Sequence, residues 1–103
     1  LGDRGSMYFA VFVVGGEAKS CAIEAIAAAK KQDFDRAQER LSQAQKALLQ
    51  AHHAQAEMLS KEAQGEKTEL SLFMVHGQDH LMTSIAFVDL AKEIVDLHKK
   101  FDE

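Results

Sequence analysis

Residues 33–63 decide the fold, and they read DFDRAQERLSQAQKALLQAHHAQAEMLSKEA. Within this stretch small and apolar side chains and one amide recur in steps of four and three, at Ala37, Leu41, Ala44, Leu48, Ala51, Gln55 and Met58. Such spacing places these side chains along one side of an α-helix. Asp33 is suited to cap the start of that helix. The stretch therefore predicts one long helix of an antiparallel bundle.

The sequence before this stretch predicts a first helix. Alanines recur there with the same steps, at Ala18, Ala22, Ala25 and Ala29, and Lys30 and Lys31 suit the negative end of a helix dipole. Residues 7–14 have strand-like side chains and two glycines follow them, but we expect them to be helical as well.

The sequence after this stretch predicts a third helix. Gly65, within Gln64-Gly65-Glu66-Lys67, can end the second helix because glycine adopts the left-handed conformation at little cost. Thr68 can then cap a helix that runs from about residue 69 to about residue 100. The interpretation is an all-α protein built as an antiparallel three-helix bundle.

The composition agrees with a single helical domain. The chain has 103 residues, of which 47% are apolar, with no proline and six glycines, so it can bury one core with few helix breakers. Residues 1–6, LGDRGS, resemble the remnant of an expression tag. We therefore expect residues 7–103 to form the one domain.

Charge and cysteine content exclude several classes of function. The net charge is −4 and no face is rich in lysine and arginine, which argues against nucleic-acid binding. The apolar run of residues 7–14 is far shorter than the roughly 20 residues that span a bilayer. Cys21 is the single cysteine and cannot form an internal disulfide, so a cytoplasmic location is expected.

Four polar side chains of the expected third helix share one face. His76, Asp79, His80 and Thr83 fall within about 100° of one another around the helix. Apolar side chains lie before and after them on the same face, at Leu72, Phe73, Phe87, Leu90, Ala91 and Ile94. A second apolar face holds Met74, Leu81, Ile85 and Val88. Two partner helices can cover only one of these faces well, so we expect other copies of the chain to cover the other, in a homo-oligomer with this helix at its centre.

His76 is the first candidate for chemistry. Neutral imidazole is a good nucleophile at neutral pH, and a phosphoryl group suits it because phosphoryl transfer depends mainly on positioning and charge stabilisation. His80 and Thr83 could donate hydrogen bonds to phosphoryl oxygens. The alternative is that His76 is an ordinary core histidine.

Asp79 is the candidate metal ligand. A carboxylate within an apolar face must be paired, protonated or bound to a metal if it is buried. If copies of the chain meet on a rotation axis, their Asp79 side chains converge and could share a hard cation such as Mg²⁺. The alternative is a solvated Asp79 at the edge of a subunit.

Other polar residues give weaker signals. A transition-metal or hydrolytic metalloenzyme site is disfavoured because the chain lacks the Glu-x-x-His pairs of helical metal bundles. His52 and His53 are expected to be exposed or at an interface. We expect Gln55 to set register, Cys21 to fill space and His98 to complement a helix dipole.

The segment Val75-His76-Gly77-Gln78-Asp79-His80-Leu81-Met82-Thr83 closely resembles the V-H-A-Q-D-H-L-M-T segment of lactose/cellobiose-type enzyme IIA proteins of the bacterial phosphotransferase system. Residues 16–20, GEAKS, are similar to the family's G-x-A-R-S. Asp33-Phe34 followed by Ala37, and Ala51-His52 followed by Gln55, resemble two further family motifs. The likeness runs from about residue 15 to about residue 100.

This resemblance implies a function. It implies that HPr donates a phosphoryl group to His76, which passes it to a cysteine of enzyme IIB for sugar uptake and phosphorylation, so that the membrane is involved only through the sugar permease. His80, Gln78 and Thr83 would have supporting roles. It also implies a homotrimer of three-helix units in which Asp79 binds a divalent cation such as Mg²⁺ shared by the subunits.

Two departures from the family pattern bear on this function. Gly77 replaces an alanine next to His76, which should weaken the helix by roughly 1 kcal/mol. Lys19 replaces an arginine, which matters if the site needs a bidentate contact. The rival hypothesis is a helical oligomeric adaptor or regulatory protein, in which the His/Asp face only sets register.

Overall fold

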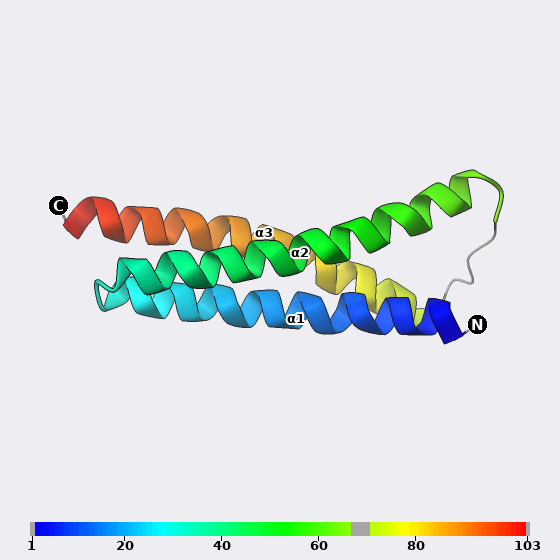
Figure 1. Cartoon of the computed structure of the whole chain (residues 1–103), viewed down its shortest axis with the longest axis horizontal. Coiled ribbons are helices and arrows are strands. Elements are labelled where there is room, and N and C mark those ends of the chain that lie inside the picture. The colour runs from blue at the N-terminus through cyan, green and yellow to red at the C-terminus, as the bar shows by residue number, and fades with distance from the viewer. Residues whose placement is uncertain (1, 67–70, 103) are drawn as a thin grey trace.

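The chain folds into three α-helices that run up, down and up (Figure 1). This computed structural model describes the backbone of residues 2–66 and 71–102 and, within those ranges, the side chains from Val13 onward. The helices are α1 (Gly2–Lys30), α2 (Phe34–Ala63) and α3 (Leu72–Asp102). The bundle is elongated, with dimensions of 54 × 20 × 18 Å. The predicted all-α, three-helix fold is confirmed.

Local sequence signals set the ends of α2. The Asp33 side chain accepts a hydrogen bond from the backbone N–H of Arg36 at 3.3 Å, as expected of an N-cap. At the other end Gly65 has a φ of 97°, which favours glycine. Both predictions are confirmed, whereas the predicted cap Thr68 lies outside the described residues. The turn before α2 was not anticipated in detail: Gln32 has a φ of 65° there.

The first helix begins earlier than the alanine spacing alone indicates. Residues 7–14 belong to α1, so the expectation that this apolar run is helical is confirmed. The helix also includes residues 2–6, the segment interpreted as a tag remnant, and that interpretation stays a prediction. Within the described part of the chain no helix is long and apolar enough to cross a bilayer.

The core consists largely of small side chains. The four alanines that recur along one side of α1 are almost completely buried. So are five of the seven residues that recur along one side of α2, namely Ala37, Leu41, Ala44, Leu48 and Ala51. Alanine lets helix axes approach closely, so the three helices pack tightly over this region. Gln55 and Met58, the last two of these recurring residues of α2, are only half-buried. The C-terminal part of α2 diverges from α1 (Figure 1).

One face of α3 packs inside the chain and the other remains open. The covered face contains Gly77, Leu81, Ser84, Val88, Ala91 and Val95. On the open face Leu72 is 86% exposed, Leu90 60% and Phe101 83%. The expectation that one chain covers a single face of α3 is confirmed. Ala91, at the edge of the face that carries His76, is also buried in the chain's own core.

Candidate functional site

His76 and His80 lie on successive turns of α3 with their rings nearly parallel. The ring centroids are 6.4 Å apart and the ring planes differ by 22°. His76 is exposed in the single chain, whereas His80 is half-buried. The alternative that His76 is a histidine of the chain's own core is therefore wrong, and its imidazole is accessible to another molecule.

Helix α1 packs against the side chain of His80. A Cβ atom added to Gly15 would lie 2.9 Å from Cδ2 of His80 and 3.2 Å from Oγ of Ser84, so the helices approach very closely here. The Ser84 hydroxyl is buried and lies 2.6 Å from the carbonyl oxygen of His80 and 3.1 Å from that of Gly15, to which it can donate. This contact between α1 and α3 fixes the turn that carries His80.

The surroundings of His80 favour its neutral form. Burial lowers the pKa of His80, and it is lowered further by the charge of Lys19 and by the charge that His76 carries when protonated, while Asp79 acts in the opposite direction. A neutral imidazole has one donor and one acceptor nitrogen. His80 can therefore donate a hydrogen bond toward a group bound at His76.

Thr83 lies one turn beyond His80 and already has partners. Its hydroxyl donates to the carbonyl oxygen of His80 at 3.1 Å and accepts from Nζ of Lys19 at 3.3 Å. Lys19 comes from α1 and is half-buried. Sequence reasoning noted Lys19 only as a departure from a family pattern and missed its place beside the candidate site.

Gln78 is not part of this group of residues. It lies about 200° around the helix from His76, and its side-chain oxygen accepts a hydrogen bond of 2.5 Å from Gln55 of α2. The Gln55 amide also lies 3.7 Å from the sulfur of Met82. Gln55 thus connects α2 to α3, as its predicted role in setting register suggests. Gln78 can support His76 only indirectly, through the position of α3.

Asp79 projects from the open face of α3 and is exposed in the single chain. Among the described residues, no three or more His, Cys, Asp or Glu side chains are grouped to hold a metal ion. A carboxylate is a suitable ligand for a hard cation, but one chain offers too few such ligands at this position. A metal at Asp79 would require carboxylates from further copies of the chain.

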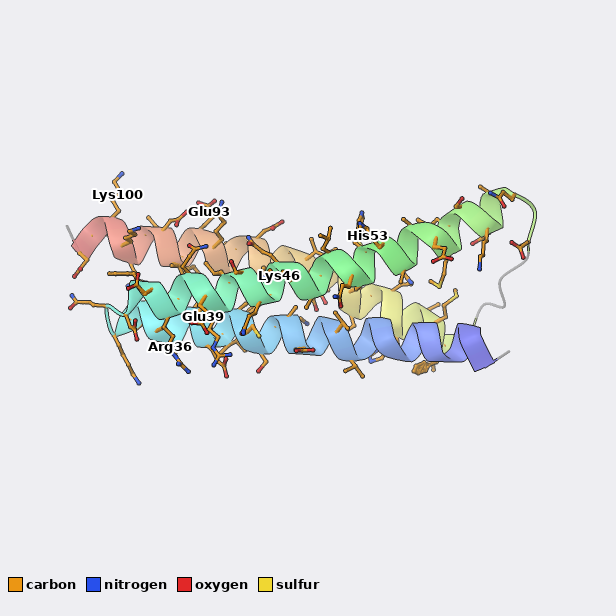
Figure 2. The ribbon with its side chains drawn as sticks, viewed as in Figure 1. Arg36, Glu39, Lys46, His53, Glu93 and Lys100 are labelled. Carbon is orange, nitrogen blue, oxygen red and sulfur yellow. The ribbon has the colours of Figure 1, made fainter. Side chains whose placement is uncertain are left out.

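The remaining histidines lie on the surface. His52, His53 and His98 are exposed, and Figure 2 shows His53 pointing away from the bundle, as does Lys100 of α3. The structure does not bring these three histidines to His76.

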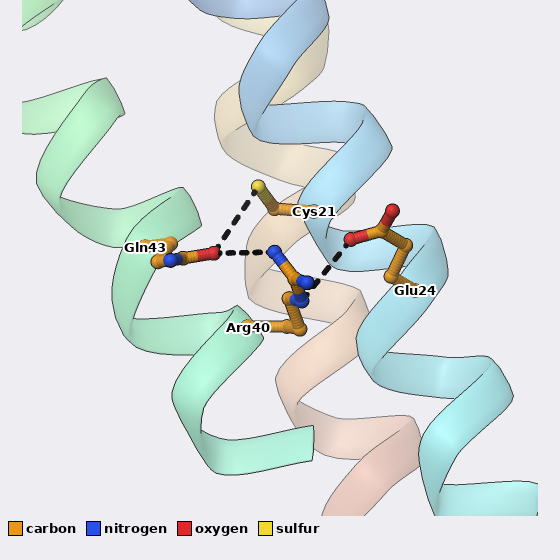
Figure 3. Close-up of polar contacts among 4 residues, drawn as sticks. All are labelled: Cys21, Glu24, Arg40 and Gln43. Carbon is orange, nitrogen blue, oxygen red and sulfur yellow. Dashed lines mark hydrogen bonds and ion pairs between the residues drawn. The ribbon is translucent and has the colours of Figure 1, made fainter. Parts of the chain in front are cut away.

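Cys21 belongs to a polar network between α1 and α2 that the sequence did not reveal (Figure 3). Its thiol lies 3.9 Å from Oε1 of Gln43, which also accepts a 2.9 Å hydrogen bond from Arg40. Nε of Arg40 lies 3.2 Å from a carboxylate oxygen of Glu24, a charge contact without hydrogen-bond alignment. Burial raises the pKa of the Cys21 thiol, as do the charges of Glu24 and Glu17, while Arg40 lowers it.

The fold and the site together define a class: a small helical protein with an accessible imidazole on the open face of one helix. Residues 6–99 match the family of lactose/cellobiose-specific IIA subunits of the phosphotransferase system (PTS). The lichenan-specific phosphotransferase enzyme IIA component of Bacillus subtilis is 47% identical over 95 residues, which cover 92% of this chain and 86% of that protein. The lactose-specific EIIA component of Streptococcus mutans is 44% identical over 92 residues, 89% of this chain and 88% of that protein.

Solved structures agree with these relatives. The PTS cellobiose-specific enzyme IIA from Bacillus anthracis superposes with a TM-score of 0.90 at 41% identity, over 94% of this chain and 89% of that chain. The IIA(Chitobiose) of Escherichia coli, solved in complex with HPr, gives a TM-score of 0.79 at 33% identity, over 96% of both chains. The chain belongs to the lactose/cellobiose-specific IIA family, and it is a phosphocarrier component of a sugar phosphotransferase system.

Proposed function

We propose that this chain accepts a phosphoryl group from HPr on His76 and passes it to the cysteine of a matching enzyme IIB during sugar uptake. The observation that carries the proposal is the accessible imidazole of His76, stacked one turn from His80 on the open face of α3. A related IIA protein has been solved in complex with HPr, which supports the choice of donor.

The chemistry requires little from the protein beyond positioning. The unprotonated ring nitrogen of His76 attacks phosphorus, a new P–N bond forms, and the bond between phosphorus and the donor breaks with its electron pair leaving on the donor. Onward transfer reverses these events with a cysteine thiolate as the nucleophile. His80 supports both steps by donating a hydrogen bond to a phosphoryl oxygen.

The proposal includes a homotrimer with α3 at its centre. The open face of α3 carries exposed apolar side chains on both sides of Asp79, which a single chain leaves in water. Three copies that meet along the Asp79 side of this face would bring three Asp79 carboxylates together, and His76, about 60° away around the helix, would lie at the edge of the contact. A divalent cation such as Mg²⁺ held by these carboxylates would offset their repulsion.

We place the carrier in the cytoplasm, where its single cysteine would remain a thiol. Contact with the membrane would be indirect, through the sugar permease. The matched relatives are named for lichenan, lactose, cellobiose and galactose, so the proposal extends to the transfer reaction and not to one sugar.

Reconstituted phosphorylation tests the proposal. The chain is incubated with phosphoenolpyruvate, enzyme I and HPr, and its intact mass is measured before and after mild acid. We expect one acid-labile phosphoryl adduct on wild type and on the control His53→Ala, and none on a folded His76→Ala variant. A folded wild-type protein that gains no adduct would favour the adaptor hypothesis instead.

A further inference from the structure

His76 and His80 form a pair of imidazoles on one face of α3. They are four residues apart, so they lie on successive turns, and their ring centroids are 6.4 Å apart. Two histidines at this spacing on one helix face can bind a single metal ion, as they do in helical zinc sites. The proposed transfer gives the two rings different roles and leaves this shared capacity unassigned.

The packing of His80 decides which of its ring nitrogens is directed toward α1. A Cβ atom added to Gly15 would lie 2.9 Å from Cδ2 of His80, and one added to Gly16 would lie 3.5 Å from Nε2. The ring edge formed by Cδ2 and Nε2 therefore lies against α1. Nδ1 is on the opposite edge of the imidazole, so it faces away from these two glycines. We therefore assign Nδ1 of His80 as the nitrogen that meets a metal ion.

The distance between the two rings is close to what a shared metal ion requires. Zn²⁺ binds imidazole nitrogen at about 2.0–2.1 Å, so two rings that share a tetrahedral ion have centroids about 5 Å apart. The observed 6.4 Å exceeds this by about 1 Å. His76 is exposed, so rotation of its side chain can close the difference while His80 keeps its place against α1.

We propose that His76 and His80 together bind one divalent transition-metal ion of the class that favours imidazole, such as Zn²⁺, Cu²⁺ or Ni²⁺. Water completes the coordination, since among the described residues no group of three or more His, Cys, Asp or Glu is arranged to hold a metal. Two protein ligands make a site that exchanges its ion, unlike a closed structural zinc site. This site is distinct from the cation proposed at Asp79, which is a hard ion held by carboxylates of three chains.

The bound ion inhibits the carrier, and this consequence rests on the proposed function. A metal ion draws electron density from the imidazole of His76 and brings its bound water to the same face. The ring becomes a poorer nucleophile toward phosphorus and less accessible to HPr. By linkage, a phosphoryl group on His76 weakens metal binding in turn.

Calorimetric titration with Zn²⁺ tests the site itself. Excess Mg²⁺ is present throughout to occupy oxygen ligands, because it binds imidazole poorly. Wild type is compared with His76→Gln, with His80→Gln and with His53→Gln, an exposed control that also removes one imidazole. A second ligand on the same helix adds affinity, so we expect each variant of the pair to bind Zn²⁺ at least about tenfold more weakly and the control to match wild type.

Phosphorylation by preformed phospho-HPr at increasing Zn²⁺ tests the consequence. We expect the Zn²⁺ concentration that halves the initial rate to be about tenfold higher for His80→Gln than for wild type, each relative to its own rate without Zn²⁺. Equal half-inhibiting concentrations would show that Zn²⁺ acts elsewhere, and would overturn the inhibition.

The outcomes separate the metal site from the carrier function. Thermal unfolding identifies the folded variants, and His80→Ala replaces His80→Gln if glutamine does not fit against Gly15. If the folded His80 variant binds Zn²⁺ as tightly as wild type, the metal site is overturned, whatever the phosphorylation assay shows. If wild type binds Zn²⁺ through both histidines but gains no phosphoryl group from phospho-HPr, the metal site stands and the proposed function fails.

Discussion

The imidazole ring of His80 packs against the backbone of Gly15, so closely that a Cβ atom at Gly15 would lie 2.9 Å from Cδ2 of the ring. Gly15 belongs to α1 and His80 to α3, so the first helix controls a side chain beside His76. The buried Ser84 hydroxyl lies against the same backbone. The shape of the site therefore depends on how closely α1 and α3 approach each other.

A bulky residue at Gly15 should disturb both stability and transfer. In Gly15→Leu the new side chain must displace the His80 ring and press on Ser84, and overpacking of this kind costs about 1–3 kcal/mol. We expect a lower free energy of unfolding in urea and slower phosphorylation of His76. Glu17→Leu, an exposed position on the same helix, is the control and should change neither quantity much. Equal stability of the two variants would contradict this packing.

His80 should contribute to transfer without being its acceptor. His80→Ala removes the hydrogen-bond donor next to His76, so we expect the initial rate of phosphorylation to fall about tenfold while the single acid-labile adduct remains. His80→Gln keeps an N–H donor and should recover part of that rate. Complete loss of the adduct in His80→Ala would instead place the phosphoryl group on His80.

Metal removal should weaken the proposed trimer through Asp79. If three carboxylates share a cation, EDTA leaves their charges uncompensated, and sedimentation equilibrium should then show smaller species at low protein concentration. Asp79→Asn removes the repulsion and should give an assembly whose mass is the same with and without EDTA. If the wild-type trimer has the same mass with and without EDTA, the Asp79 side chains share no cation.

Periodicity predicted the fold because most of the residues that recur along one side of α1 and α2 are small side chains whose role is to pack between helices. Ala18, Ala22 and Ala25 in α1, like Ala37 and Ala44 in α2, are too small to pack except where helices are close, and all are completely buried. The spacing of His76, His80 and Thr83 likewise placed them on one face, which the structure confirms. Asp33 and Gly65 act where their backbone preferences predicted.

Long-range polar contacts could not be predicted in this way. Both faces of α3 are apolar, so periodicity could not decide which one the chain covers. Lys19 and Thr83 are 64 positions apart, and their contact depends on the register between two helices, which no local pattern determines. Gln78 is a different case: the motif resemblance groups it with His76, but it lies about 200° away around the helix and contacts Gln55 instead.

The turn after α2 should depend on glycine at residue 65. Gly65 has a φ of 97° and a Cβ atom there would meet nothing within 4 Å, so Gly65→Ala tests backbone strain alone. We expect a loss of about 1–2 kcal/mol in the free energy of unfolding, measured in urea. Gly65→Asn should lose less, because asparagine tolerates positive φ better than alanine. A neutral Ala variant would show that this conformation is not required.

The Cys21 thiol should react slowly, and its neighbours should tune the rate in opposite directions. Its pKa is raised by burial first and then by Glu24 and Glu17, so at a given pH less thiolate is present than in an unfolded peptide. In the folded chain the rate of alkylation by iodoacetamide should therefore begin to rise at a higher pH than it does in an unfolded peptide. Glu24→Gln removes a negative charge and should move this rise to lower pH, while Arg40→Gln removes the opposing positive charge and should move it higher. The thiol stays buried in both variants, so neither should show the pH dependence of an unfolded peptide. If both variants move the rise in rate in the same direction along the pH axis, altered packing and not charge controls the thiol.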